Sequence, residues 1–198
     1  MASAGMTANE LFVHAGNLFN QKNYAQALEA YLKFKADFGA SPDVAKALHA
    51  SLFPTAFCCV RQGRFAEAVP AIGEALAAQP PLSPQQIQDL TFWLGISHLQ
   101  KRDFPAAREA FEKFIAMFPA GNLKNPLFLR QNPAAARVPE AGMLIGTSWI
   151  QEGKNREAAD WHSKLKPSLG PELRGRAVVF QLHSLIELGE KEAAMHVV

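Results

Sequence analysis

The chain of 198 residues lacks the sequence motifs that mark most enzymes and membrane proteins. It has no glycine-rich phosphate loop, no His-Glu-x-x-His motif and no Cys-x-x-Cys pair. Its six histidines are scattered singly along the sequence, which argues against a metal site. No apolar run approaches the roughly 20 residues needed to span a bilayer. We therefore predict a non-enzymatic chain with no catalytic, cofactor-binding or metal-binding residue, no cofactor and no integral membrane segment.

Cysteine and charge are also scarce. The two cysteines, Cys58 and Cys59, are adjacent, and neighbouring side chains on a helix point about 100° apart, too far to close an unstrained disulfide. We expect both to be small buried apolar residues. The net charge is only +2, and no run of five or six like charges occurs. This balance predicts no nucleic-acid partner.

The first residues give little information about location. Residues 1–7 lack a basic region followed by an apolar run, so no signal peptide is visible. We expect these residues to be flexible. The predicted location is cytoplasmic if this start is native, and periplasmic if a signal peptide was trimmed.

The sequence contains an internal repeat. Residues 23–27, 63–68 and 102–107 each place an aromatic residue after a turn and an alanine three residues later. The separations of the equivalent alanines are 41, 39, 51 and 36 residues, and these alanines are Ala27, Ala68, Ala107, Ala158 and Ala194. Self-similarity at such a period sets the architecture and predicts recognition rather than catalysis.

The apolar residues of each copy recur at helical spacing, which predicts a helix, a tight turn and a second helix. Asn23 and Asp103 are expected to cap second helices with their side chains. Ser83 and Gln86 are spaced to form a capping box. Pro54 and Pro70 fall inside predicted helices, where we expect a local bend.

These features resemble the tetratricopeptide repeat (TPR), whose ideal period is about 34 residues. The third copy carries the clearest motif, with Leu94-Gly95, His98, Ala107, Phe111 and Pro119. A weaker fourth copy has His162 where an aromatic residue usually lies. The resemblance implies an all-α fold: a TPR-like α-solenoid of antiparallel helix pairs that form a right-handed superhelix.

The repeats divide the chain into segments. Residues 8–119 hold three TPR-like repeats, over residues 8–40, 41–80 and 83–119. Residues 120–139 contain several Pro and Gly interruptions and are expected to form an irregular inserted loop. Residues 140–198 hold two further degenerate repeats, the last of them truncated.

The resemblance also implies a binding surface, because the first helices of such repeats line a concave groove. A protein or peptide partner, such as an apolar helix, is expected there. By register, Gly16 also belongs to this face, and the predicted partner-binding residues are Phe12, Phe19, Asn20, Phe53, Phe57, Val60, Arg61, Phe92, Ile96, Leu99 and Gln100. Two alternatives stay open: coverage of the groove by the apolar segment Leu127, Phe128 and Leu129, and self-association of the array, for which the C-terminal end is a candidate surface.

The stretch Phe111–Pro119 is similar to bacterial envelope TPR proteins of the Tol-Pal-associated and outer-membrane-assembly types. It implies a scaffold or adaptor in envelope assembly. The alternative is an N-terminal recruiting or regulatory module of a larger TPR or enzyme-containing protein. A bound metal or cofactor would instead favour an enzyme.

Overall fold

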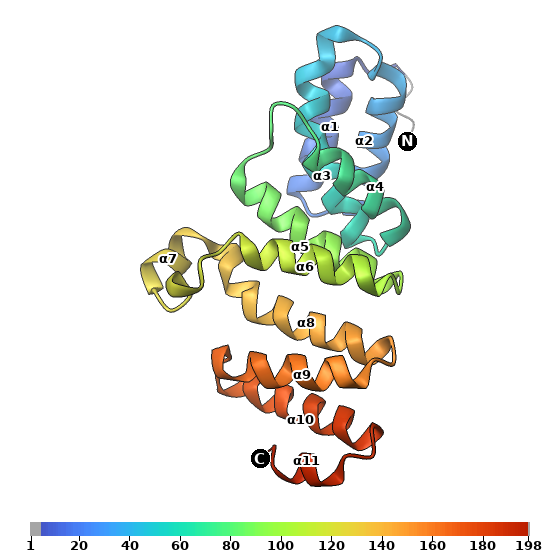
Figure 1. Cartoon of the computed structure of the whole chain (residues 1–198). Helices are drawn as coiled ribbons and strands as arrows, with labels where there is room; N and C mark the ends of the chain where they lie inside the picture. The colour runs from blue at the N-terminus through green and yellow to red at the C-terminus, as the bar shows by residue number, and fades with distance from the viewer. Residues whose placement is uncertain (1–4, 198) are drawn as a thin grey trace. The chain divides into compact units, whose positions relative to one another are not determined.

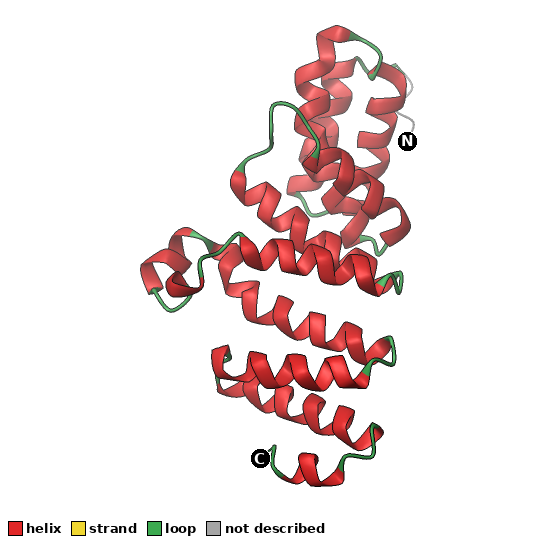
Figure 2. Cartoon of the chain, in the orientation of Figure 1, coloured by secondary structure: helices red, strands yellow, loops and turns green. Residues whose placement is uncertain are grey.

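The computed structural model describes residues 5–197, and these residues form helices joined by turns and loops, with no β-strand among them (Figures 1 and 2). The all-α prediction is therefore confirmed. Residues 1–4, part of the segment predicted to be flexible, and Val198, the last residue of the fifth repeat, lie outside the described part. The α-helices are α1 (Ala8–Asn20), α2 (Tyr24–Phe38), α3 (Ala45–Arg61), α4 (Phe65–Leu76), α5 (Pro84–Gln100), α6 (Phe104–Ala116), α7 (Pro126–Gln131), α8 (Val138–Gln151), α9 (Asn155–Leu165), α10 (Pro171–Glu187) and α11 (Lys191–Met195). The short 3-10 helices are η1 (Pro42–Val44), η2 (Ala120–Asn122), η3 (Pro133–Arg137) and η4 (Lys166–Ser168).

The chain divides into two compact units, residues 1–97 and residues 98–198, which we call the N-terminal and C-terminal units. In the N-terminal unit α1 packs on α2, α3 packs on α4, and α2 contacts α3. In the C-terminal unit α6 packs on α8, and α8, α9, α10 and α11 follow as successive neighbours (Figure 1).

Five three-residue turns share one geometry. They join α1 to α2, α3 to α4, α5 to α6, α8 to α9 and α10 to α11. The middle residue of each turn has a left-handed φ between 61° and 79°, and these residues are Lys22, Gly63, Arg102, Gly153 and Gly189. In each case the next backbone N–H donates a 2.9 Å hydrogen bond to a carbonyl near the end of the first helix, as in a Schellman motif. The equivalent alanines follow these turns at a constant spacing, and all five are buried.

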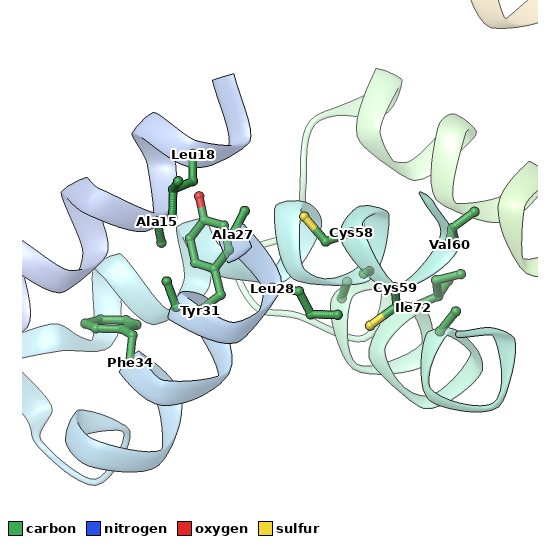
Figure 3. Packing of buried hydrophobic residues seen from close by; sticks show 14 of the residues in the cluster. Ala15, Leu18, Ala27, Leu28, Tyr31, Phe34, Cys58, Cys59, Val60 and Ile72 are labelled. Atoms are coloured by element: carbon green, nitrogen blue, oxygen red, sulfur yellow. The ribbon is translucent and has the colours of Figure 1, made fainter. Parts of the chain in front are cut away.

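Small residues in the N-terminal unit allow its helices to approach closely. Ala15 of α1 and Ala27 of α2 are fully buried, and the ring of Tyr31 lies beside Ala15 (Figure 3). Cys58 and Cys59 are free and buried in the same core, as predicted. Burial raises the pKa of the Cys58 thiol to about 12, so the thiol stays protonated at neutral pH.

The cap predictions are confirmed at one helix and wrong at two. Ser83 and Gln86 form the capping box: the Gln86 N–H donates to Ser83 Oγ at 3.3 Å, and the Ser83 N–H donates to Gln86 Oε1 at 3.1 Å. Asn23 and Asp103 make no side-chain cap. The Asn23 amide donates to Gln26, and Asp103 pairs with His98. Both residues directly follow a left-handed turn residue, where the backbone hydrogen bond already closes the connection.

Two proline-containing helices continue without a break. Pro54 lies inside α3, and Pro70 lies inside α4. Each proline leaves one carbonyl in the preceding turn without its helical N–H donor. Those carbonyls belong to Ala50 and Ala66, which are exposed, so water can supply the missing hydrogen bond.

The segment predicted as an irregular loop over residues 120–139 is largely helical, which corrects that expectation. It contains η2, α7, η3 and the first residues of α8. The Asn125 side chain caps α7 by accepting hydrogen bonds from the N–H groups of Leu127 and Phe128. Asn-Pro pairs, read from the sequence as interruptions, here begin short helices because proline fits the first helical turn.

A buried cation fixes α6 against α8 in the C-terminal unit. Arg108 of α6 is only 6% exposed. Its guanidinium carbon lies 3.4 Å from the ring centroid of Trp149, one nitrogen donates to Ser148 Oγ at 3.2 Å, and another lies 2.7 Å from Glu152 Oε2. Lys154 approaches the same indole at 5.2 Å. The Trp149 ring therefore contacts two cations.

Candidate interaction surface

The turn geometry defines one face on each first helix. Relative to the left-handed turn residue, the predicted groove residues occupy the same four positions in α1, α3 and α5. We call this set of positions the first-helix face. Its residues in the N-terminal unit are Phe12, Gly16, Phe19 and Asn20 of α1, Phe53, Phe57, Val60 and Arg61 of α3, and Phe92 and Ile96 of α5.

Three aromatic rings of this face meet the ring of Tyr24, the first residue of α2, in the N-terminal unit. Phe57 lies 5.7 Å from Phe19, 5.5 Å from Tyr24 and 5.9 Å from Phe53 between ring centroids. Phe19 and Tyr24 are 5.8 Å apart. All four side chains are half-buried, so each keeps accessible apolar surface. We call Phe19, Tyr24, Phe53 and Phe57 the aromatic cluster.

A cation borders the aromatic cluster. The Arg61 guanidinium carbon lies 5.5 Å from the centroid of the Tyr24 ring, and the Arg61 side chain is exposed. Among the described residues no carboxylate pairs with Arg61. The surface therefore combines aromatic rings with one exposed positive charge at its edge. Such rings give a large apolar contact area with little loss of side-chain entropy.

Not every predicted residue offers surface to a partner. Val60, Phe92 and Leu99 are 6%, 2% and 8% exposed, so their side chains are buried and cannot line an accessible groove. Val60 belongs to the N-terminal core. Phe12 is half-buried against Tyr31 and Phe34. Ile96 is half-buried, and Asn20 and Gln100 are exposed.

Sequence reasoning missed Tyr24 and the corresponding face of the C-terminal unit. Tyr24 was assigned only to the repeat motif, although its ring contacts both Phe19 and Phe57. The spacing from Gly189 places Val179, His183, Ile186 and Glu187 of α10 on the first-helix face. Val179 and Ile186 are 60% and 61% exposed. Counting back from each turn glycine would have found them.

The segment predicted to cover the groove does not bury its first apolar residue. Leu127 is 55% exposed, while Phe128 and Leu129 are half-buried. Helix α7, which carries all three residues, packs on the adjacent η3. Coverage of the groove by this segment stays a prediction.

A cavity of about 630 Å³ lies elsewhere in the N-terminal unit. Leu48 and Leu52 line it together with Lys35 and Glu74, whose side chains pair at 2.6 Å. His49, also at the cavity, lies 2.6 Å from the Pro80 carbonyl oxygen. Its size suits a small molecule, but these charged groups already pair with one another. None of the predicted partner-binding residues lines it.

Two further properties concern metals and membranes. No group of three His, Cys, Asp or Glu side chains is placed to hold a metal ion within residues 5–197. No helix in that range is long and apolar enough to cross a membrane.

Comparison with known proteins supports the repeat fold. Residues 60–122 match the family model described as tetratricopeptide repeat. One similar crystal structure is that of the nearly identical TPR-like repeats of a Podosopora anserina protein described as a kinesin light chain. It matches with a TM-score of 0.58 at 14% identity. The match covers 96% of this chain and 90% of that one. A variant of that protein gives a TM-score of 0.57 at the same identity and coverage.

At 14% identity this likeness shows the fold alone. No curated protein matches the chain. The predicted resemblance to TPR proteins and the TPR-like solenoid fold are confirmed. The proposed place in a bacterial envelope stays a prediction from residues 111–119.

Proposed function

We propose that this chain is a protein-interaction module that binds a partner on its first-helix face. The proposal starts from the TPR-like repeat fold. TPR repeats generally mediate protein–protein interactions, and the fold is typical of non-enzymatic scaffolds. In our proposal the aromatic cluster of the N-terminal unit accepts an apolar helix or an extended apolar segment.

The observation that carries the proposal is the continuous contact among four half-buried rings from three helices. Phe19 comes from α1, Tyr24 from α2, and Phe53 and Phe57 from α3. A partner that covers these rings would remove apolar surface from water, which is the main driving force of most association. Interface hot spots are rich in such aromatic anchors.

The test compares two double variants on purified protein. Phe53→Glu/Phe57→Glu places two charges in the aromatic cluster. Val13→Glu/Leu32→Glu makes the same kind of change at exposed apolar residues of the same unit that lie off the first-helix face. Circular dichroism must first show equal helicity for wild type and both variants.

We expect a protein retained from lysate by wild type and by the control variant to be lost by Phe53→Glu/Phe57→Glu. With that protein purified, the affinity should fall at least about tenfold, because burying one Phe contributes about 1.5–3 kcal/mol. A photocrosslinking residue at position 57 should link to the partner, and one at position 13 should not. Equal retention by both variants would refute the proposal.

A further inference from the structure

His162 is a titratable side chain in a position that the other repeats fill with non-basic residues. It lies in α9 and is 0% exposed. The equivalent residues of the second helices in the first three repeats are Tyr31, Ile72 and Phe111, and all three are buried. Among the five repeats only the fourth places an imidazole at this position.

The imidazole is enclosed on several sides. Its Nδ1 lies 2.8 Å from the Ala158 carbonyl oxygen, so the neutral ring donates its N–H there. Its Nε2 has no hydrogen-bond partner. A Cβ built on Gly146 of α8 would lie 2.3 Å from Nε2, which shows how closely the backbone of α8 approaches. The ring of Phe180, from α10, packs at 5.4 Å.

No charged group on the described elements packed against α9 forms an ion pair with the His162 imidazole. Helix α9 contacts α8, α10 and η4, and Ala159 packs with Ala194 of α11. The titratable and charged residues on these elements and at their ends are Arg137, Glu140, Glu152, Lys154, Arg156, Glu157, Asp160, Lys164, Lys166, Glu172, Arg174, Arg176, His183, Glu187, Glu190, Lys191, Glu192 and His196. None of them forms an ion pair with His162. Burial lowers the pKa of His162, opposed only by the hydrogen bond to Ala158.

Protonation would place an N–H at Nε2 with no acceptor and a positive charge that water cannot reach. Because the pKa of His162 is lower in the folded state, the unfolded state binds more protons as the pH falls. The stability that neutral His162 contributes is therefore complete above about pH 6.5 and is lost as the pH falls below that value.

We propose that His162 is a pH-sensitive contact: in its neutral form it allows α9 to pack between α8 and α10, and its protonation loosens the C-terminal unit. The helix pairs α1–α2 and α3–α4, which carry Tyr31 and Ile72 at the equivalent positions, keep their packing. The inference concerns this chain alone and does not depend on which partner it binds.

The experiment follows amide hydrogen exchange at about pH 7.5 and about pH 5.5, corrected for intrinsic rates. In wild type we expect protection factors in α8, α9 and α10 to fall by up to about tenfold, because an unfolded imidazole with a pKa of about 6.5 gains at most that factor in proton binding over this range. Protection in α1–α4 should stay constant. In His162→Phe the pH-dependent loss of protection in α8–α10 should disappear. The third repeat carries Phe111 at the equivalent position, so a phenylalanine ring can be packed there.

Two controls keep the proposal falsifiable. His183→Gln removes an exposed histidine from α10 and should behave like wild type. If His162→Phe fails to fold, NMR titration of the wild-type imidazoles decides, because His162 must titrate below about pH 6.5. An ordinary or raised titration midpoint, or an equal loss of protection in both units, would overturn the proposal.

Discussion

At the scale of single residues, the chain places glycines at positions with opposite packing demands. A Cβ on Gly146 would meet His162 at 2.3 Å, whereas a Cβ on Gly175 of α10 would meet nothing within 4 Å. Both glycines lie inside helices. Replacing each glycine by alanine therefore tests two different effects: a steric clash at Gly146 and the restriction of backbone freedom alone at Gly175.

Gly146→Ala should lower the free energy of unfolding by about 1–3 kcal/mol, since the added methyl group forces the buried imidazole to move. Gly175→Ala should raise it by about 0.4–1 kcal/mol, because alanine restricts the unfolded chain and favours the helix. Urea denaturation of both variants measures the two effects. Equal effects of the same sign would show that α8 and α9 are farther apart than described.

The residue scale also shows what the sequence could and could not predict. Adjacency argued against a disulfide between Cys58 and Cys59, and their predicted burial as small apolar residues is confirmed. The burial of Phe92 and Leu99 could not be predicted, because helical register gives the direction of a side chain but not what covers it. Tyr24 was missed because its position in the repeat motif hid its contacts with Phe19 and Phe57.

At the scale of helices, Arg108 joins α6 to α8 through one aromatic ring. The guanidinium carbon is 3.4 Å from the Trp149 centroid and is almost fully shielded from water. A cation–π contact strengthens as it is desolvated. The contact between Arg102 and Phe104, at 5.7 Å with an exposed arginine, provides a natural comparison within the same unit.

A double-mutant cycle with Arg108→Met and Trp149→Leu should give a coupling free energy of about 2 kcal/mol. The corresponding cycle with Arg102→Met and Phe104→Leu should give about 0.5 kcal/mol or less, because solvent screens the exposed charge. Thermal and urea unfolding supply the four stabilities in each cycle. Similar coupling in the two cycles would contradict the role assigned to burial.

Helix capping shows a second limit of sequence reasoning at this scale. Ser83 precedes a helix that follows a long connection, and its capping box formed as predicted. Asn23 and Asp103 carry good capping side chains but lie in three-residue turns closed by backbone hydrogen bonds. The residue type alone does not tell a helix with a side-chain cap from one that follows a turn closed by backbone hydrogen bonds. The length of the preceding connection does.

At the scale of the whole molecule, the N-terminal unit has a core that extends beyond its four paired helices. Leu90 of α5 is fully buried in that core, and Ile87, Trp93 and Leu94 pack against it. Helix α5 therefore covers apolar surface that α1–α4 would otherwise expose. A fragment of this unit requires α5 for its full stability.

We expect a fragment of residues 1–101 to unfold in one cooperative transition and a fragment of residues 1–82 to be less stable by at least about 3 kcal/mol. Leu90→Ala in the longer fragment should cost about 2–5 kcal/mol, which tests the same contact without truncation. Urea titrations followed by circular dichroism give all three stabilities. If the two fragments are equally stable, α5 does not belong to this core.

The architecture was easier to predict than the site, for a physical reason. Ala27, Ala68 and Ala107 are needed wherever two helices approach closely, so packing repeats them along the sequence. Short helices such as α7 carry no repeat and were read as irregular. Which residues of a proposed interaction face stay accessible, as Val179 and Ile186 do, depends on the complete fold.

The uniform turns have a consequence for how the length of the chain can change. Adding one residue inside a helix pair would rotate one helix about 100° against its partner and misplace every contact between them. Additions between pairs, where residues 77–83 and 117–125 already vary the spacing, leave each pair intact. Evolutionary insertions, and any engineered splicing of repeats, should therefore be tolerated after second helices and excluded from the turns at Lys22, Gly63, Arg102, Gly153 and Gly189.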